Sequence, residues 1–133
     1  MLIPHLHFRG NCAEAIALYE KAFHTQADEI VSHDDYDPET YPGDKRIAHA
    51  NMKIHGQTVF LNDNDCMFGH ADTSISFPVH LIIQFKSADE LLACYGLLKE
   101  EGETEHPFTE TPYSALVGNF KDKLGVLWGF MVA

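Results

Sequence analysis

Hydrophobic and polar residues follow the same order twice along this chain. In the first half, an extended segment precedes an amphipathic helical segment and three strand-like segments, at residues 2–8, 12–23, 27–32, 47–54 and 58–61. In the second half, the corresponding segments lie at residues 76–85, 88–101, 103–108, 114–120 and 126–132. A period of two indicates a strand, and a spacing of three or four indicates a helix. The pattern predicts two βαβββ modules, neither of which could bury its sheet and helix alone.

The two modules are expected to form one domain over residues 1–133. The first module should span about residues 1–66 and the second about 76–133, with residues 67–75 as the linker. A chain of this length can build one sizeable core but not two independent ones. The predicted fold class is therefore α+β.

Polar residues mark the ends of the predicted elements. Asn11 is expected to be the N-cap of the first helix, with Glu14 completing a capping-box-like start. Ser87 or Asp89 is expected to cap the second helix. Residues 33–45 are acidic and contain prolines, so they predict an irregular surface loop that covers or borders a cavity.

Histidines occupy one face of several predicted strands. In the first strand, His5 and His7 alternate with apolar residues, so both imidazoles point away from the helix if the apolar side chains pack against it. His49 and His80 also lie on the faces of their strands opposite the main apolar residues. Such histidines serve either as hydrogen-bonding groups of the structure or as ligands of a metal or substrate.

Composition and charge exclude several classes of partner. The formal net charge of -11 disfavours nucleic acids and anionic membrane surfaces, and the nine Lys and Arg residues form no basic patch. The N-terminus lacks the basic region of a signal peptide, and no apolar run approaches the roughly 20 residues of a membrane span. The three cysteines are far apart, as expected for reduced thiols. A cytoplasmic location is therefore expected.

The chain resembles the vicinal-oxygen-chelate superfamily, which has the glyoxalase and bleomycin-resistance fold, and within it the PhnB-like branch. The resemblance covers nearly the whole chain and rests on FRGNCAEA at residues 8–15, IAHA at 47–50, LND at 61–63 and DKLGVLWG at 122–129. It implies two βαβββ modules that form curled mixed sheets around a cavity, in a protein that is commonly a homodimer.

The resemblance also provides a pattern of metal ligands for comparison. Superfamily enzymes such as glyoxalase I bind a divalent metal through four strands, usually with His, Glu, His and Glu. In this chain His80 falls on the third position, and His5 lies near the first. The second and fourth positions fall on Phe60 and Gly129, which offer no metal-binding atom. The implied metals are Zn, Ni, Mn or Fe, whose Lewis acidity would polarise a substrate oxygen.

Two functions are consistent with this incomplete pattern. The first is a protein that binds a small molecule in a metal-free cavity, as bleomycin-resistance proteins do. That cavity would be lined by His5, His7, His49, Phe60, His80 and Trp128, although Trp128 also fits simple core packing. The alternative is a divalent-metal-dependent lyase, isomerase or dioxygenase-type enzyme with an atypical site around His5, His7 and His80, in which His5 and His80 bind the metal. In that case Asp63 or Glu110 are candidates for the missing carboxylates.

Methyltransferase activity, a label that this branch sometimes carries, finds no support in the residues. No glycine-rich loop follows the first predicted strand to hold a nucleotide-like cofactor, and the repeat differs from that of a doubly wound fold.

Overall fold

The computed structural model describes residues 1–63 and 79–133. The chain divides into two compact units, Met1–Ala71 and Asp72–Ala133. The linker predicted at residues 67–75, together with Cys66 and the first residues of the predicted strand at 76–85, lies outside the described residues.

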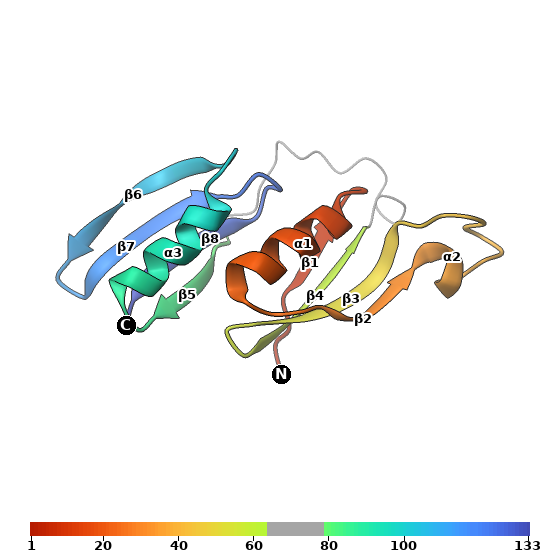
Figure 1. The fold of residues 1–133 in the computed structure, drawn as a ribbon, viewed down its shortest axis with the longest axis horizontal. Coiled ribbons are helices and arrows are strands. Elements are labelled where there is room, and N and C mark those ends of the chain that lie inside the picture. The colour runs from red at the N-terminus through yellow and green to blue at the C-terminus, as the bar shows by residue number, and fades with distance from the viewer. Residues whose placement is uncertain (64–78) are drawn as a thin grey trace. The chain divides into compact units, whose positions relative to one another are not determined.

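The first unit is a four-stranded sheet with one long and one short helix (Figure 1). Its elements are β1 (His5–Phe8), α1 (Cys12–Phe23), β2 (Asp28–Ser32), α2 (His33–Tyr36), β3 (Ile47–Ile54) and β4 (Gln57–Asp63). The strand order is β1-β4-β3-β2, in which β1 and β4 run parallel and the other pairs are antiparallel.

The second unit repeats this topology without the short helix. Its elements are β5 (Leu81–Phe85), α3 (Ala88–Leu98), β6 (Glu103–Thr111), β7 (Ser114–Lys121) and β8 (Leu127–Val132). The strand order is β5-β8-β7-β6, again with one parallel pair, between β5 and β8. The expected α+β class with two βαβββ modules is confirmed, and both sheets are mixed and open.

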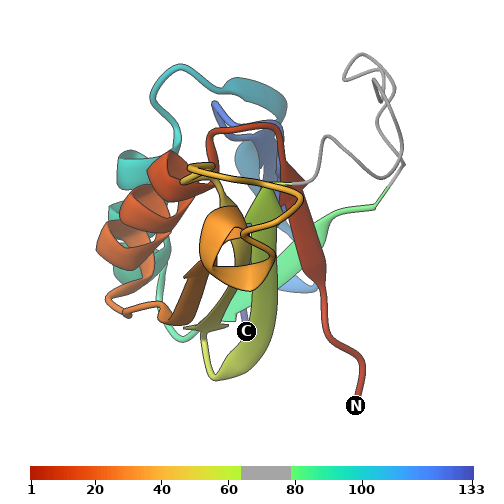
Figure 2. The same ribbon diagram turned by 90° about the vertical axis from the view of Figure 1, so that its right-hand side faces the viewer.

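Each long helix covers one face of its own sheet (Figures 1 and 2). Helix α1 buries an apolar stripe, consisting of Cys12, Ala15, Ile16, Tyr19, Ala22 and Phe23. Helix α3 buries Leu91, Cys94 and Leu98. Complete burial of one such leucine or phenylalanine side chain stabilises the fold by about 1.5–3 kcal/mol. Each unit therefore has a helix-covered face that carries its core and a second face of mixed polarity.

Two features of the first unit differ from the sequence-based expectations. The side chain of Asn11 makes no capping hydrogen bond to α1. The carboxylate of Asp63 fills this role instead, because it accepts from the backbone N–H of Cys12 at 3.0 Å. The expected irregular loop at residues 33–45 begins with the short helix α2, for which the Ser32 hydroxyl accepts a cap hydrogen bond from the Asp35 N–H.

The second helix begins as expected and ends earlier. The Ser87 hydroxyl accepts from the backbone N–H of Glu90 at 3.2 Å, which confirms Ser87 as a cap. The helix ends at Leu98, three residues before the predicted end, and the left-handed backbone of Glu101, with φ of 60°, does not fit the predicted helix. Among the described residues, no helix is long and apolar enough to cross a membrane.

Candidate functional site

The face of the first sheet opposite α1 gathers three imidazoles, two of which contact one aromatic ring. In β1, Phe8 is buried on the α1 side, so His5 and His7 lie on the other side. Phe60 of β4 is directly opposite His5 in the parallel register. His49 reaches the same ring from β3. We call this set of His5, His7, His49 and Phe60 the imidazole face.

Contacts between rings connect the members of the imidazole face. The His5 and His7 rings are 4.2 Å apart between centroids. Phe60 makes edge-to-face contacts with His5 at 5.9 Å and with His49 at 4.9 Å. Both separations fall in the range of favourable aromatic pairs, so Phe60 links the histidines of the two strands that flank it.

An amide supports one end of the imidazole face. The Nδ1 atom of His7 lies 2.7 Å from the side-chain oxygen of Asn62, which follows Phe60 by two residues in β4. Because that oxygen is an acceptor, Nδ1 of His7 carries the proton. Nε2 of a neutral His7 is then an acceptor. Asn62 belongs to the LND motif, but nothing in the sequence pattern indicates that His7 is its partner.

The pKa of His5 is lowered from its ordinary value of 6.5. Burial is the largest cause, followed by the charges that His7 and His49 would carry. Desolvation and like charges both disfavour the imidazolium form. The ring of His5 is therefore mainly neutral near pH 7, with one nitrogen that donates a hydrogen bond and one that accepts.

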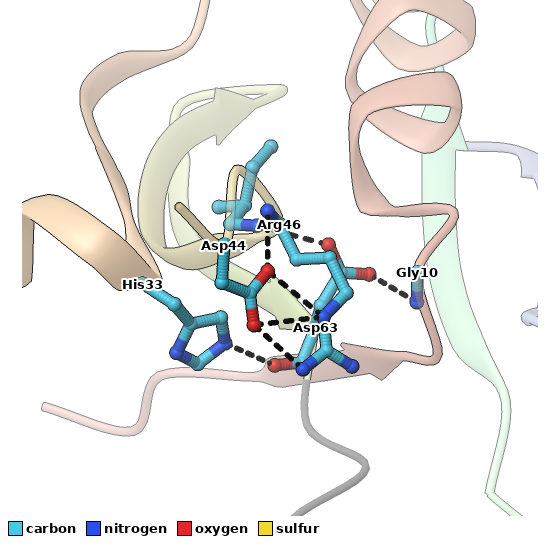
Figure 3. A network of polar contacts seen from close by, with 6 residues as sticks. Gly10, His33, Asp44, Arg46 and Asp63 are labelled. Carbon is cyan, nitrogen blue, oxygen red and sulfur yellow. Dashed lines mark hydrogen bonds and ion pairs between the residues drawn. The ribbon is translucent and has the colours of Figure 1, made fainter. Parts of the chain in front are cut away.

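A carboxylate network holds the strands that carry the imidazole face (Figure 3). Asp63 is 2% exposed, and its Oδ1 accepts from the N–H groups of Gly10 and Cys12 at 2.7 and 3.0 Å. Its Oδ2 accepts from the N–H of Ile47 at 3.0 Å. Asp63 thus joins the end of β4, the turn after β1 and the start of β3. These backbone contacts occupy both carboxylate oxygens, which disfavours the use of Asp63 as a replacement metal ligand.

The segment between α2 and β3 packs against this network. Nε2 of His33 lies 2.9 Å from the backbone carbonyl oxygen of Asp63, to which it donates. Asp44 binds the guanidinium of Arg46, with the closest contact at 2.8 Å. Hydrogen bonds from Arg46, first from its side chain and then from its backbone, lower the pKa of Asp44 to about 2. The network therefore fixes the acidic segment that the sequence predicted as a loop (Figure 3).

The second unit contains the two remaining candidate residues at separate places. Nε2 of His80 lies 2.7 Å from Oε2 of Glu105, a residue that the sequence analysis did not select. Trp128 is 1% exposed, and its indole N–H donates to Oδ2 of Asp122 at 2.9 Å. This placement favours core packing for Trp128 over a position on a cavity wall.

The residues at the superfamily's four metal positions do not fit that metal site. Phe60 presents an aromatic ring at the second position, and its neighbour in register is His5. At the fourth position, a Cβ added to Gly129 would lie 3.0 Å from Oδ1 of Asn119 and 3.2 Å from Cγ1 of Ile82. Within residues 1–63 and 79–133, no group of three or more His, Cys, Asp or Glu side chains is arranged to hold a metal ion. No step of the function is therefore assigned to a metal.

Comparison with known proteins gives the family. The family model described as 3-demethylubiquinone-9 3-methyltransferase matches residues 1–131. The chain belongs to this family. The chain is also similar to Protein YjdN from Escherichia coli K12, which is 28% identical over 138 residues, covering 96% of this chain and 91% of YjdN.

Solved structures support the fold of this 3-demethylubiquinone-9 3-methyltransferase family member. The PhnB protein from Bacillus cereus is similar with a TM-score of 0.81 and 22% identity, over 99% of this chain and 98% of that one. A glyoxylase/bleomycin resistance protein/dioxygenase domain from Frankia sp. EAN1pec has a TM-score of 0.69 and 16% identity, over 100% and 90% of the two chains. The PhnB-like assignment and the glyoxalase-like fold are thereby confirmed.

Proposed function

We propose that this protein binds a small organic molecule on the imidazole face. The observation that carries the proposal is the cluster of His5 and His49 on either side of the Phe60 ring. Side chains on a solvated sheet face are usually varied, so two imidazoles on one aromatic ring, with His7 stacked against His5, favour recognition of a ligand. The glyoxalase-like fold supports the proposal only by analogy, because one fold serves many functions.

The chemistry of the imidazole face favours a planar ligand with hydroxyl or carbonyl groups. Phe60 offers a ring surface for stacking or edge contacts. His5, which is mainly neutral near pH 7, can donate one hydrogen bond and accept another. Phenols and hydroxylated aromatic acids combine these features, and they are the class that we expect to bind.

Methyl transfer, which the family description names, is not part of the proposal. Each sheet has only one parallel strand pair and a long helix on one face. A doubly wound nucleotide-binding fold instead has a mostly parallel sheet with helices on both faces, and its glycine-rich turn binds the cofactor phosphate. The metal-dependent alternative is not advanced either, because the residues at the second and fourth ligand positions do not fit.

Binding can be tested with a panel of catechol, 4-hydroxybenzoate and 2,3-dihydroxybenzoate. Isothermal titration should find at least one binder, and the imidazole resonances of His5 and His49 should move in its presence. His5→Ala and His49→Ala should each weaken binding about tenfold, as expected when one buried polar contact and its packing are lost. His106→Ala, which removes an exposed imidazole of β6, is the matched control. Unchanged affinity in both variants would refute the site.

We also propose that the protein forms a homodimer. Both sheets are open, so each has edge strands with unpaired backbone groups that favour association. Light scattering at micromolar concentration should give twice the chain mass of 15.0 kDa. A mass of one chain would contradict this assembly.

A further inference from the structure

In the second unit, the imidazole of His80 is in direct contact with the carboxylate of Glu105. Nε2 of His80 lies 2.7 Å from Oε2 of Glu105, and the two side chains are only 29% and 34% exposed. His80 immediately precedes β5, and Glu105 lies on β6. These are the two edge strands of the second sheet, with β8 and β7 between them in the strand order. The pair therefore connects opposite edges of one sheet.

Strand alternation places this pair on the face of the second sheet opposite α3. Ile83 and Phe85 are buried, whereas Ile82 is 67% exposed, so even-numbered residues of this strand face away from the helix. Extending the alternation by two residues places His80 on the same side. The position of a Cβ on Gly129 lies close to Ile82 and to the side-chain amide of Asn119, so both belong to this face.

The contact determines the hydrogen-bonding roles of the His80 ring. A carboxylate only accepts hydrogen bonds, so Nε2 of His80 carries the proton that Glu105 accepts. In the neutral form of the ring, Nδ1 then carries the lone pair that can accept a proton. An imidazole oriented by a carboxylate on one nitrogen and basic at the other is the arrangement that general bases use.

We propose that His80 and Glu105 form a proton-transfer dyad, in which His80 is a catalytic base and Glu105 is its positioning residue. The substrate class is a small carbon acid or phenol. Its C–H or O–H proton moves to Nδ1 of His80, and the bonding electron pair stays on the substrate as an enolate or phenolate. The imidazolium is stabilised by the carboxylate of Glu105, and it later returns the proton to the substrate or to water.

The dyad is distinct from the proposed ligand site of the first unit. Its residues are His80 and Glu105, whereas the imidazole face consists of residues from β1, β3 and β4. A negative result for phenol binding at the imidazole face would leave the dyad standing, and the reverse is also true.

Base activity can be measured with 5-nitrobenzisoxazole, a probe that needs only a base. Removal of its ring C–H proton places the electron pair in a nitrile as the N–O bond breaks, and the coloured 2-cyano-4-nitrophenolate is released. The full-length protein should accelerate this reaction, and His80→Ala should lower the rate about tenfold or more, since a positioned base contributes at least that much. His106→Ala, an exposed histidine of the same unit, should leave the rate unchanged.

Variants of Glu105 must distinguish its orientation of the His80 ring from an effect on folding. Glu105→Ala should lower the rate several-fold, and the double variant with His80→Ala should be no slower than His80→Ala alone, because Glu105 acts through His80. Glu105→Gln, which keeps an acceptor oxygen, should restore part of the loss. Glu103→Ala, which removes an exposed carboxylate of the same strand, is the matched control.

Nitrogen NMR of the His80 ring reports which ring nitrogen is protonated. This signal would not change if Glu105 had a purely structural role. In the wild type, Nε2 should have the shift of a protonated nitrogen and Nδ1 that of a bare one. The difference between the two shifts should shrink in Glu105→Ala as the second tautomer becomes populated. Circular dichroism confirms that each variant is folded. A folded His80→Ala variant with wild-type rate, or additive losses in the double variant, would overturn the proposal.

Discussion

The carboxylate of Asp63 caps the helix that begins at Cys12, a residue 51 positions earlier in the chain. Because the same carboxylate also accepts from the N–H of Ile47, it links three segments of the first unit. A helix N-terminus is usually capped by the residue just before it. Here the cap comes from the end of a neighbouring strand, so helix and sheet are fixed to each other by one buried group.

Asp63→Asn should destabilise the protein although the two side chains have nearly the same shape. An amide has only one acceptor oxygen. If that oxygen accepts from the N–H groups of Gly10 and Cys12, the NH2 group of the asparagine must face the N–H of Ile47. Loss of that charge-assisted bond, with a buried donor left unpaired, should lower the free energy of unfolding by about 1–3 kcal/mol. Urea denaturation provides the measurement. Asp28→Asn, on the exposed part of β2, should change it little.

The second unit uses a carboxylate in a related way. Asp122 accepts from the N–H groups of Leu124 and Val126 at 2.9 and 3.1 Å, and from the indole of Trp128 at 2.9 Å. It closes the turn between β7 and β8 and satisfies the polar atom of a buried ring. Each unit thus contains a buried aspartate that accepts several hydrogen bonds, although Asp63 ends β4 and Asp122 follows β7, which are not equivalent strands of the repeat.

Trp128→Phe should therefore lower the free energy of unfolding by more than the loss of ring volume alone would. The substitution removes the only indole donor in the chain and leaves Oδ2 of Asp122 without that hydrogen bond. We expect a loss of about 2–4 kcal/mol in the free energy of unfolding, from the lost hydrogen bond to the buried carboxylate together with the cavity. Phe130→Leu, in the same core, provides a comparison for volume alone. Equal losses in the two variants would argue against a role for the hydrogen bond.

Local patterns in the sequence predicted the elements and their faces well. The period-two alternation around His5 and His7 was sufficient to orient β1, and the spacing of apolar residues gave the bounds of α1. Long-range partners were not predictable in the same way. Asn62 and Glu105 contact residues 55 and 25 positions away, and such contacts depend on strand register and sheet curvature. For the same reason, Asn11 occupies the expected N-cap position, but the capping hydrogen bond comes from Asp63 and not from its own side chain.

The pKa of His5 makes the stability of the protein depend on pH in a defined range. Its folded-state pKa lies below the ordinary value of 6.5, so the unfolded chain binds the proton more readily. The free energy of unfolding should hence fall as the pH drops from about 6.5 through the lower folded-state pKa. Above that range His5 is neutral in both states and contributes no such dependence.

Urea denaturation at about pH 7.5 and about pH 5 measures this effect. His5→Gln should show a smaller loss of stability between the two pH values than the wild type, because the titrating group is gone. The exposed residue His106 gives the control variant His106→Gln, which should retain the wild-type loss. If His5→Gln loses as much stability between the two pH values as the wild type, the pH dependence arises from other groups.

Phe60 stands at the position where the superfamily's metal site has a carboxylate. A substitution at residue 60 can test whether the neighbouring histidines could bind a metal. Phe60 is opposite His5 in register and contacts His49, so a carboxylate at residue 60 would stand between two imidazoles. Imidazole and carboxylate together are a donor set that suits Zn²⁺. Phe60→Glu should therefore bind Zn²⁺ about tenfold or more tightly than the wild type, as measured by titration calorimetry. Phe60→Gln has a similar size and polarity without the charge, and it should show little gain. If Phe60→Glu binds no more tightly than Phe60→Gln, the imidazoles are not placed to share a metal, and their grouping serves the organic ligand alone.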